Sequence, residues 1–457
     1  MTQGTSENLA QAPLGPSLVR LVVPMFMGMV MIALVGVVDA FFIGMLGTEA
    51  LAAFGLCYPA VMVLQALMFG LANGITASVA RARGQRGGGL GPQDRLRVSV
   101  AVRMAVALAM FLAALGAIVG PPAFHHATSE SIAKLATAYY LPFLLSMVLL
   151  SVPMSLTACM RGFGETRSSA TVMTLASVLN AGLDPVFMFG YGPIPAYGMA
   201  GASISTVAAY VVSMVYASVL MRRTMKGAAR GAPRGLRTRT VVREVAAIGG
   251  PAMLAQALGP VGASVVTALA TGFGPTALAG LGIVQRIDLL VVIVPVATGA
   301  GAMPLVGHLA GAGNRPRAAE ALQLARRSMV LWAVLIGGLL NVVAAPLAGM
   351  FTQQGSVAEI VQLALIFAPI SYIGAGLNIT TMSCFNAAGH PPLATKLSAM
   401  YSVLLLPLGC LVGSQWFGLP GLFGGSACAS AIAATIGTRW MRHADLLPSA
   451  RVEQPAE

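Results

Sequence analysis

The sequence predicts an all-α, polytopic membrane protein with twelve transmembrane helices in two six-helix lobes. Three observations lead to this fold class. First, 57% of the 457 residues are hydrophobic and only 9% are charged, which is about a third of the charged fraction of an average soluble protein. Second, the apolar residues form long runs rather than the short alternating segments of a membrane β-barrel. Third, the basic residues gather between those runs.

Each predicted span is an apolar run of about 20 or more residues, the length that crosses a bilayer as a helix. Several runs are longer than the bilayer requires, so we expect tilted helices or helices that extend beyond the membrane. The predicted spans are residues 18–45, 50–80, 98–119, 132–160, 168–190, 198–221, 244–271, 277–307, 328–351, 357–386, 394–417 and 419–440.

The positions of the basic residues support a count of twelve. Connections after odd-numbered spans, such as 46–49 and 190–197, contain no Lys or Arg, whereas connections after even-numbered spans are basic. Because positive loops stay in the cytoplasm, we expect an inner-membrane protein with both termini inside the cell. The net charge of +13 therefore indicates orientation in the bilayer and predicts no nucleic-acid partner.

An internal repeat divides the spans six and six. Residues 47–56 (GTEALAAFGL) match residues 274–283 (GPTALAGLGI) at an offset of 227, and Gly198 matches Gly418 farther on. Both halves begin on the same side of the membrane, so the repeats are parallel, an arrangement that suits alternating access around a site between two lobes. The predicted organisation is a disordered tail at 1–17, lobes at 18–224 and 244–443, a basic linker at 225–243, and a second tail at 444–457.

The five cysteines indicate no cofactor or structural metal site. They lie within or beside apolar spans, are odd in number and show no Cys-x-x-Cys spacing, which argues against a disulfide framework or a zinc site.

Asp39 is the residue of the first span that most needs a function. It is the only charged residue between Leu21 and Met45. A carboxylate inside a membrane span is costly, and it usually faces a protein-lined or hydrated cavity where it handles ions or substrate. We therefore interpret Asp39 as an ion-coupling or substrate-binding residue.

A second buried carboxylate is expected at Asp184 in the fifth span. Asn180 precedes it by four residues, so the two side chains share one helix face. Pro185 donates no backbone hydrogen bond and loosens the helix beside the carboxylate. Asp39 and Asp184 both lie roughly 9–12 Å from the outer ends of their spans, counted at the helical rise. If they face each other, repulsion and desolvation favour the protonated form of at least one of them, as a proton-coupled carrier needs.

These segments resemble the multidrug and toxic compound extrusion (MATE) family of transporters. The matching stretches are residues 38–47 (VDAFFIGMLG), 50–53 (ALAA), 161–166 (RGFGET), 179–185 (LNAGLDP), 198–202 (GMAGA), 285–287 (QRI), Gly307 and 311–313 (GAG). The resemblance covers nearly the whole chain. It implies a bundle of six plus six helices that exports bulky, often cationic, lipophilic compounds in exchange for H⁺ or Na⁺, and we expect a monomeric carrier embedded in the lipid bilayer.

Within that family the chain most resembles the DinF-like branch, whose acidic cluster lies in the N-terminal lobe. The other main bacterial branch also has acidic residues in the seventh and tenth spans, where this chain offers Gln256, Asn378 and Asn386 instead. The resemblance therefore makes ion coupling through the second lobe doubtful. Thr206 fits the family's spacing from Gly201, so Ser203 and Thr206 are candidates to supply hydroxyl groups to the Asp39 cluster.

Two further residues complete the predicted site. Arg286 interrupts the eighth span near the depth of Asp39, and we interpret it as a movable counter-ion for the first-lobe carboxylates. Alternatively, Arg286 has a structural role and pairs with a backbone carbonyl at a helix end. Pro24 and Pro185 are candidate helix hinges. Asp39, Asn180 and Asp184 could also hold Na⁺, since that ion needs only oxygen ligands.

The favoured function is secondary active efflux of lipophilic or cationic small molecules, coupled to H⁺ with Na⁺ as the alternative ion, and without enzymatic activity. A lipid-linked precursor flippase of the same superfamily is the second reading, although Arg286 is the only clear cation within the spans. An intramembrane aspartyl protease needs two membrane carboxylates, but its Tyr-Asp and Gly-x-Gly-Asp motifs are absent from these sites. A passive channel gives no reason for buried titratable residues in one lobe only.

Overall fold

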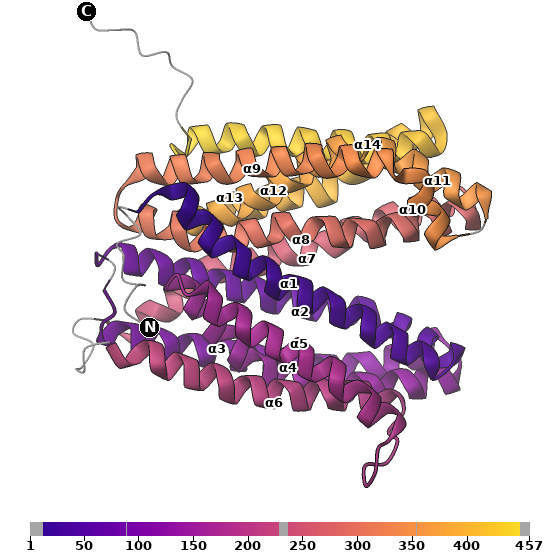
Figure 1. Cartoon of the computed structure of the whole chain (residues 1–457), viewed down its shortest axis with the longest axis horizontal. Coiled ribbons are helices and arrows are strands. Elements are labelled where there is room, and N and C mark those ends of the chain that lie inside the picture. Colours follow the sequence, from indigo (N-terminus) through magenta and orange to yellow (C-terminus); the bar gives the residue numbers. More distant parts are fainter. Residues whose placement is uncertain (1–11, 88, 228–235, 353, 448–457) are drawn as a thin grey trace, which may run out of the picture. The chain divides into compact units, whose positions relative to one another are not determined.

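The protein is helical throughout the residues that the structure, a computed structural model, describes: 12–87, 89–227, 236–352 and 354–447. Figure 1 shows the helices in chain order. They are α1 (Leu14–Met45), α2 (Thr48–Gly84), α3 (Pro92–Ala127), α4 (Glu130–Gly162), α5 (Thr166–Phe189), α6 (Met199–Thr224), η1 (Met225–Gly227), α7 (Thr238–Thr271), α8 (Pro275–Gly311), α9 (Arg315–Val342), α10 (Ala344–Phe351), α11 (Gly355–Ile366), α12 (Ala368–Ala388), α13 (Pro391–Ala399), η2 (Met400–Leu405) and α14 (Leu406–His443). The predicted all-α membrane fold is confirmed.

The last four predicted spans do not coincide with single helices of the structure. The ninth consists of α9 and α10, and the tenth consists of α11 and α12, which meet at an angle of 55°. The last two predicted spans form one long helical segment that Gly418 interrupts with φ 63° and ψ −141°. The backbones of Gly413 and Gly421, and of Gly409 and Gly425, lie against each other across this break. The two arms are therefore antiparallel, and each arm is a separate span.

The chain forms two compact units, which we call the N-terminal and C-terminal units. The N-terminal unit contains Leu21–Val79 and Gly89–Pro260, and the C-terminal unit contains Met1–Arg20, Ala80–Gly88 and Val261–Glu457. Their boundaries cut through α1, α2 and α7, so these helices contribute to both units. α1 begins at Leu14, four residues before the predicted start of the first lobe. Residues 1–11, 228–235 and 448–457, which include most of the predicted tails and the middle of the predicted linker, lie outside the described residues.

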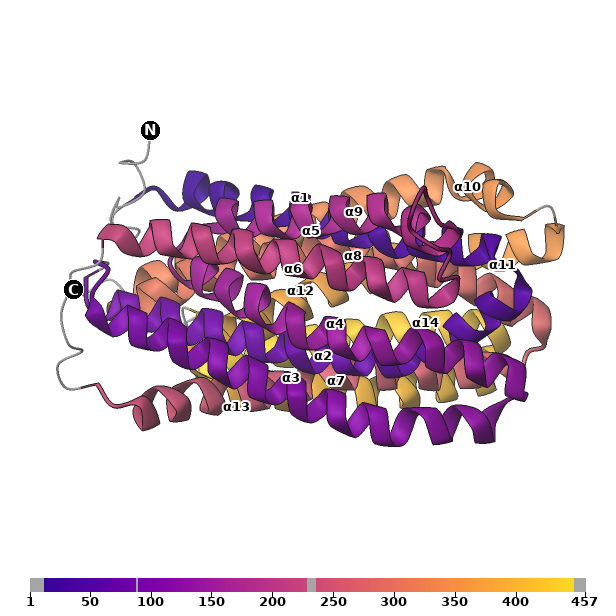
Figure 2. The same ribbon diagram turned by 90° about the horizontal axis from the view of Figure 1, so that it is seen from below.

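Each unit is organised around its most buried helix. In the N-terminal unit α4 packs against α3, α5 and α6 (Figure 2). It has no charged residue between Lys134 and Arg161, and the hydroxyl groups of its three buried serines donate to carbonyls of their own helix, as Ser146 does to Phe143 at 2.7 Å. In the C-terminal unit α12 packs against α8, α9 and α14. α4 and α12 belong to the fourth span of each repeat, so the repeats share this central element.

The repeats also share a glycine turn that precedes their last span. Gly198 has φ 55° and ψ −130°, close to the values at its repeat partner Gly418. This region is accessible almost only to glycine. Three residues later, Gly201 and Gly421 bring their helices against the backbone of the preceding span, at Phe187 and Gly413. The repeat predicted from the sequence is therefore visible as the same backbone geometry in both units.

We predict that Gly421→Ala lowers the thermal unfolding midpoint, because the added Cβ would lie 1.9 Å from the carbonyl oxygen of Gly413. Overpacking of this kind costs about 1–3 kcal/mol. The matched control is Gly282→Ala in α8, where a Cβ meets no atom within 4 Å. Tryptophan fluorescence of purified protein in detergent follows unfolding. Equal midpoints for the two variants would contradict the close approach of the two arms.

Candidate functional site

The carboxyl groups of Asp39 and Asp184 interact directly with each other in the N-terminal unit. Asp39 lies on α1 and is half-buried, whereas Asp184 lies on α5 and is fully buried. The sequence placed both residues at similar depth without showing which way they point. The structure brings them together, as a shared proton or ion site requires.

Asn180 connects this carboxyl pair to α6. Its Nδ2 atom lies 3.4 Å from Oδ1 of Asp184, 3.1 Å from Oγ of Ser205 and 3.1 Å from Oγ1 of Thr206. An amide group has only two N–H donors, so these three acceptors share them. Asn180 is buried, and its amide therefore fixes the spacing of α5 and α6 at the level of the carboxylates.

Ser205 is a site residue that the sequence analysis missed. Its hydroxyl donates a short hydrogen bond to Oδ1 of Asp184. The sequence feature that could have identified Ser205 is its position next to Thr206, in the serine- and threonine-containing stretch 203–206. Ser203, which was a candidate, instead donates to the backbone carbonyl of Tyr139 at 2.6 Å and holds α6 against α4.

One oxygen of each carboxyl group has no donor among the described residues. These are Oδ1 of Asp39 and Oδ2 of Asp184, and both atoms are buried. Buried polar atoms are almost always paired, and two carboxylate oxygens can bond only through a proton or a cation. The cluster therefore has the donor set for a shared proton or for a small cation such as Na⁺, to which Asp39, Asp184 and the oxygens of Asn180, Ser205 and Thr206 could contribute.

Aromatic side chains lie beside the cluster. Tyr139 and Tyr210 are close enough to interact electrostatically with Asp39. Tyr139 is itself buried, and its ring stacks on Phe143 with centroids 6.0 Å apart and meets Phe54 edge-on at 5.4 Å. Low polarity strengthens electrostatic interactions, so a change of charge at Asp39 has a large energetic effect here.

The two candidate hinge prolines lie inside helices. Pro24 is within α1, four residues after the boundary at Arg20 where α1 passes from one unit to the other. Pro185 follows Asp184 directly and lies in the last turns of α5. Both positions remain predicted hinges.

Arg286 is exposed on α8 in the C-terminal unit, and its pairing with the first-lobe carboxylates stays a prediction. Asp288, two residues later, is half-buried and accepts a hydrogen bond from the Tyr372 hydroxyl at 2.7 Å. Residues two apart on a helix point in different directions. The side chains of Arg286 and Asp288 therefore lie in different surroundings.

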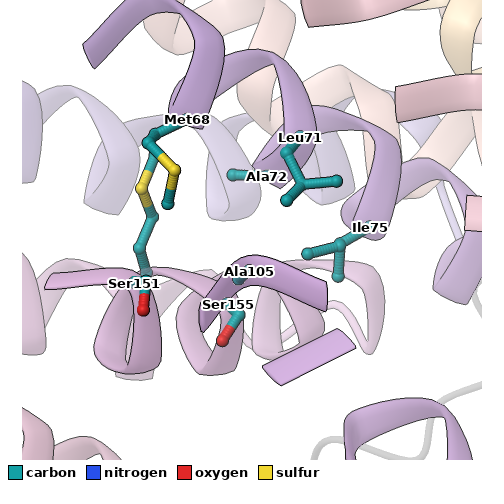
Figure 3. Close-up of a pocket in the computed structure, with 8 residues that line it drawn as sticks. Met68, Leu71, Ala72, Ile75, Ala105, Ser151 and Ser155 are labelled. Atoms are coloured by element: carbon teal, nitrogen blue, oxygen red, sulfur yellow. The ribbon is translucent and has the colours of Figure 1, made fainter. Parts of the chain in front are cut away.

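A gap between α2, α3 and α4 contains no second polar site. Met68, Leu71 and Ile75 line it together with Ser151 and Ser155 (Figure 3). The two serine hydroxyls donate to carbonyls of their own helix, at Val148 and Val152. The gap has no room for a water-sized molecule, so it is a packing contact.

Comparison with known proteins connects this geometry to one family. The sequence model of the MatE family matches residues 24–186 and 251–411. An FAD transporter of Shewanella oneidensis is 30% identical over 419 residues, which are 91% of each chain. The probable multidrug resistance protein NorM of Thermotoga maritima is 24% identical over 78% of this chain and 75% of its own. The crystal structure of the Vibrio cholerae MATE transporter VcmN in the bent form has a TM-score of 0.86 at 25% identity, covering 97% of this chain and 98% of that one.

We predict that Ser205→Ala lowers the unfolding midpoint at neutral pH more than Ser203→Ala does, because Ser205 donates to a carboxyl group and Ser203 to a neutral carbonyl. A hydrogen bond to a charged group contributes about 1.5–3 kcal/mol, against about 0.5–1.5 kcal/mol for a neutral one. The difference should shrink at low pH, where the carboxyl group is protonated. Thermal unfolding in detergent at several pH values measures it. A difference that does not change with pH would contradict a charged acceptor.

Proposed function

Because the chain belongs to the MATE family of multi-pass membrane transporters, we propose that it is an antiporter that exports lipophilic, often cationic, small molecules in exchange for protons. Family membership makes it an efflux transporter of small molecules and not an enzyme, which removes the aspartyl protease alternative. The flippase alternative loses support because the carboxyl cluster is acidic, whereas a lipid-linked phosphate calls for a basic cavity.

The observation that supports proton coupling is the pair of buried carboxyl oxygens without donors, on Asp39 and Asp184. A single proton between the two groups gives each oxygen a partner and removes the repulsion between two charges in an apolar bundle. Ser205 and Asn180 donate to Asp184, so Asp184 is the better stabilised of the two as a carboxylate. Asp39 has fewer donors and is the group that we assign to proton exchange.

Transport follows from the change of charge at this pair. A proton taken up from the outside neutralises Asp39 and weakens the attraction of the site for a cationic substrate, which favours its release outside. Movement of the two lobes then exposes the site to the cytoplasm, where the proton leaves and a new substrate binds. From the basic connections we infer that the linker and both termini lie on the cytoplasmic side. We take the carrier to act as a monomer.

Sodium is the competing coupling ion. Three oxygen-bearing side chains, those of Asn180, Ser205 and Thr206, adjoin the pair, and this donor set suits a small hard cation as well as a proton. The described residues contain no group of three or more His, Cys, Asp or Glu side chains of the kind that holds a transition metal. Transport measured under a pH gradient and under a Na⁺ gradient distinguishes the two coupling ions.

A flavin dinucleotide is a second candidate substrate. The relative from Shewanella oneidensis is named as an FAD transporter and aligns with 91% of this chain. An acidic cluster disfavours the phosphates of such a compound, so these would have to bind away from Asp39 and Asp184. FAD and ethidium are both fluorescent, and one assay compares them.

We predict that Asp39→Asn abolishes efflux driven by an ion gradient and reduces it to the passive leak, because the amide cannot exchange a proton. Purified protein in liposomes is loaded with ethidium or FAD, and release is followed under an imposed pH gradient or Na⁺ gradient. Glu49→Gln is the matched control, since Glu49 is an exposed carboxylate at the start of α2. Substrate movement that ignores both gradients would refute antiport, and full coupled efflux by Asp39→Asn would refute the role of Asp39.

We predict that Arg286→Ala shifts the pH dependence of efflux, because removal of a cationic counter-ion favours the protonated form of the carboxyl pair at higher pH. The half-maximal pH should therefore move upward. Arg327→Ala is the control, because Arg327 is an exposed basic residue of α9 at the opposite, arginine-rich end. An unchanged profile in Arg286→Ala leaves Arg286 as a structural residue only.

A further inference from the structure

A cavity of about 280 Å³ lies wholly within the C-terminal unit. Residues of α7, α8, α11, α12, α14 and η2 line it. Small-molecule sites typically measure about 300–1,000 Å³, so this cavity accommodates one compact ring system rather than a large flexible compound.

The cavity occupies the place that corresponds, in the repeat, to the carboxyl cluster of the N-terminal unit. Val266 is the counterpart of Asp39 at the offset of 227, and Ser426 is the counterpart of Thr206 at the offset that relates Gly198 to Gly418. Both Val266 and Ser426 line the cavity. The same part of the repeat therefore contains a filled polar cluster in one unit and an apolar cavity in the other.

Aromatic residues make up much of the cavity wall. Phe367, Tyr372, Tyr401 and Phe423 all line it. Aromatic rings favour flat partners through offset stacking or edge-to-face contact. A wall of this kind selects planar ring systems.

Asp288 supplies the only acidic group among the lining residues, and no Lys or Arg is among them. Its Oδ1 accepts from Tyr372 at 2.7 Å, and no other described residue donates to it. The nearby hydroxyl of Ser426 donates to the carbonyl of Phe423, and Gln285 donates to Thr267. Asp288 is half-buried, so its second carboxyl oxygen is free to accept from water or from a ligand in the cavity.

We infer that this cavity binds a planar heteroaromatic ring of the transported compound, with Asp288 accepting a hydrogen bond from a ring N–H or aromatic amine. That the bound ring belongs to a transported compound rests on the proposed function, whereas the binding measurement that tests the cavity does not. In this scheme the N-terminal cluster binds the coupling ion, and the C-terminal cavity binds the ring of the substrate.

The test is equilibrium binding to the purified full-length protein in detergent, without any gradient. The probes are lumichrome, a neutral planar heterocycle with ring N–H groups; 1,3-dimethyllumichrome, which lacks them; and ethidium, a planar cation with aromatic amines. Fluorescence titration gives each Kd. We expect lumichrome or ethidium to bind the wild type, and dimethyllumichrome to bind at least about tenfold more weakly than lumichrome, as for the loss of a hydrogen bond to a charged group.

Two variants localise the binding. Asp288→Asn should raise the Kd of the N–H-bearing probe about tenfold or more and leave dimethyllumichrome unchanged, whereas Ala375→Phe, which fills the cavity from α12, should weaken every probe. Glu49→Gln, at an exposed position at the start of α2, should bind all probes like the wild type. Unfolding midpoints show that the variants are folded. An unaltered Kd in both Asp288→Asn and Ala375→Phe, or no binding of any probe to the wild type, would overturn the inference; loss of gradient-driven efflux with intact binding would count against the proposed function alone.

Discussion

The rest of the N-terminal unit depends on the cost of placing two carboxyl groups side by side in an apolar helix bundle. Three factors bear on that cost: Ser205 and Asn180 donate to Asp184, aromatic residues around Tyr139 pack beside the pair, and, in the proposed function, a proton or cation between the groups removes their repulsion. The first two are fixed by packing, and only the third can change during transport. The energetics of the cluster are thus tied to the presence of an ion.

The fold was predictable from the sequence because lipid imposes a simple rule. Every backbone group within the bilayer must be hydrogen-bonded internally, so an apolar run of sufficient length becomes a helix. The breaks were harder to predict. Gly418 could be placed between two spans from its repeat partner Gly198. The bend between α11 and α12 at Phe367 is marked only by Pro369, a proline in the first turn of α12, and prolines also occur inside other spans of this chain.

The candidate site was predictable in its residues but not in its geometry. Asp39 and Asp184 stand out because charges are rare in spans, and their depth follows from counting residues. Hydropathy does not fix the rotation of a helix about its axis in a span that is apolar on all sides, so the direct contact between the two groups needed the structure. Ser205 was overlooked since serine is common in helix packing. Nothing local in the sequence pairs Asp288 with its hydrogen-bond partner Tyr372, which lies 84 residues away.

The matching glycine turns at Gly198 and Gly418 have an evolutionary consequence. A tandem duplication gives two copies of a backbone, and each copy can change its side chains independently as long as its tight turns survive. In this chain the two turns have similar dihedral angles, whereas Asp39 corresponds to Val266 and Thr206 corresponds to Ser426 at equivalent positions of the repeat. A few glycines are therefore enough to preserve the backbone geometry of the repeat while the two copies differ in the polarity of the side chains at these positions.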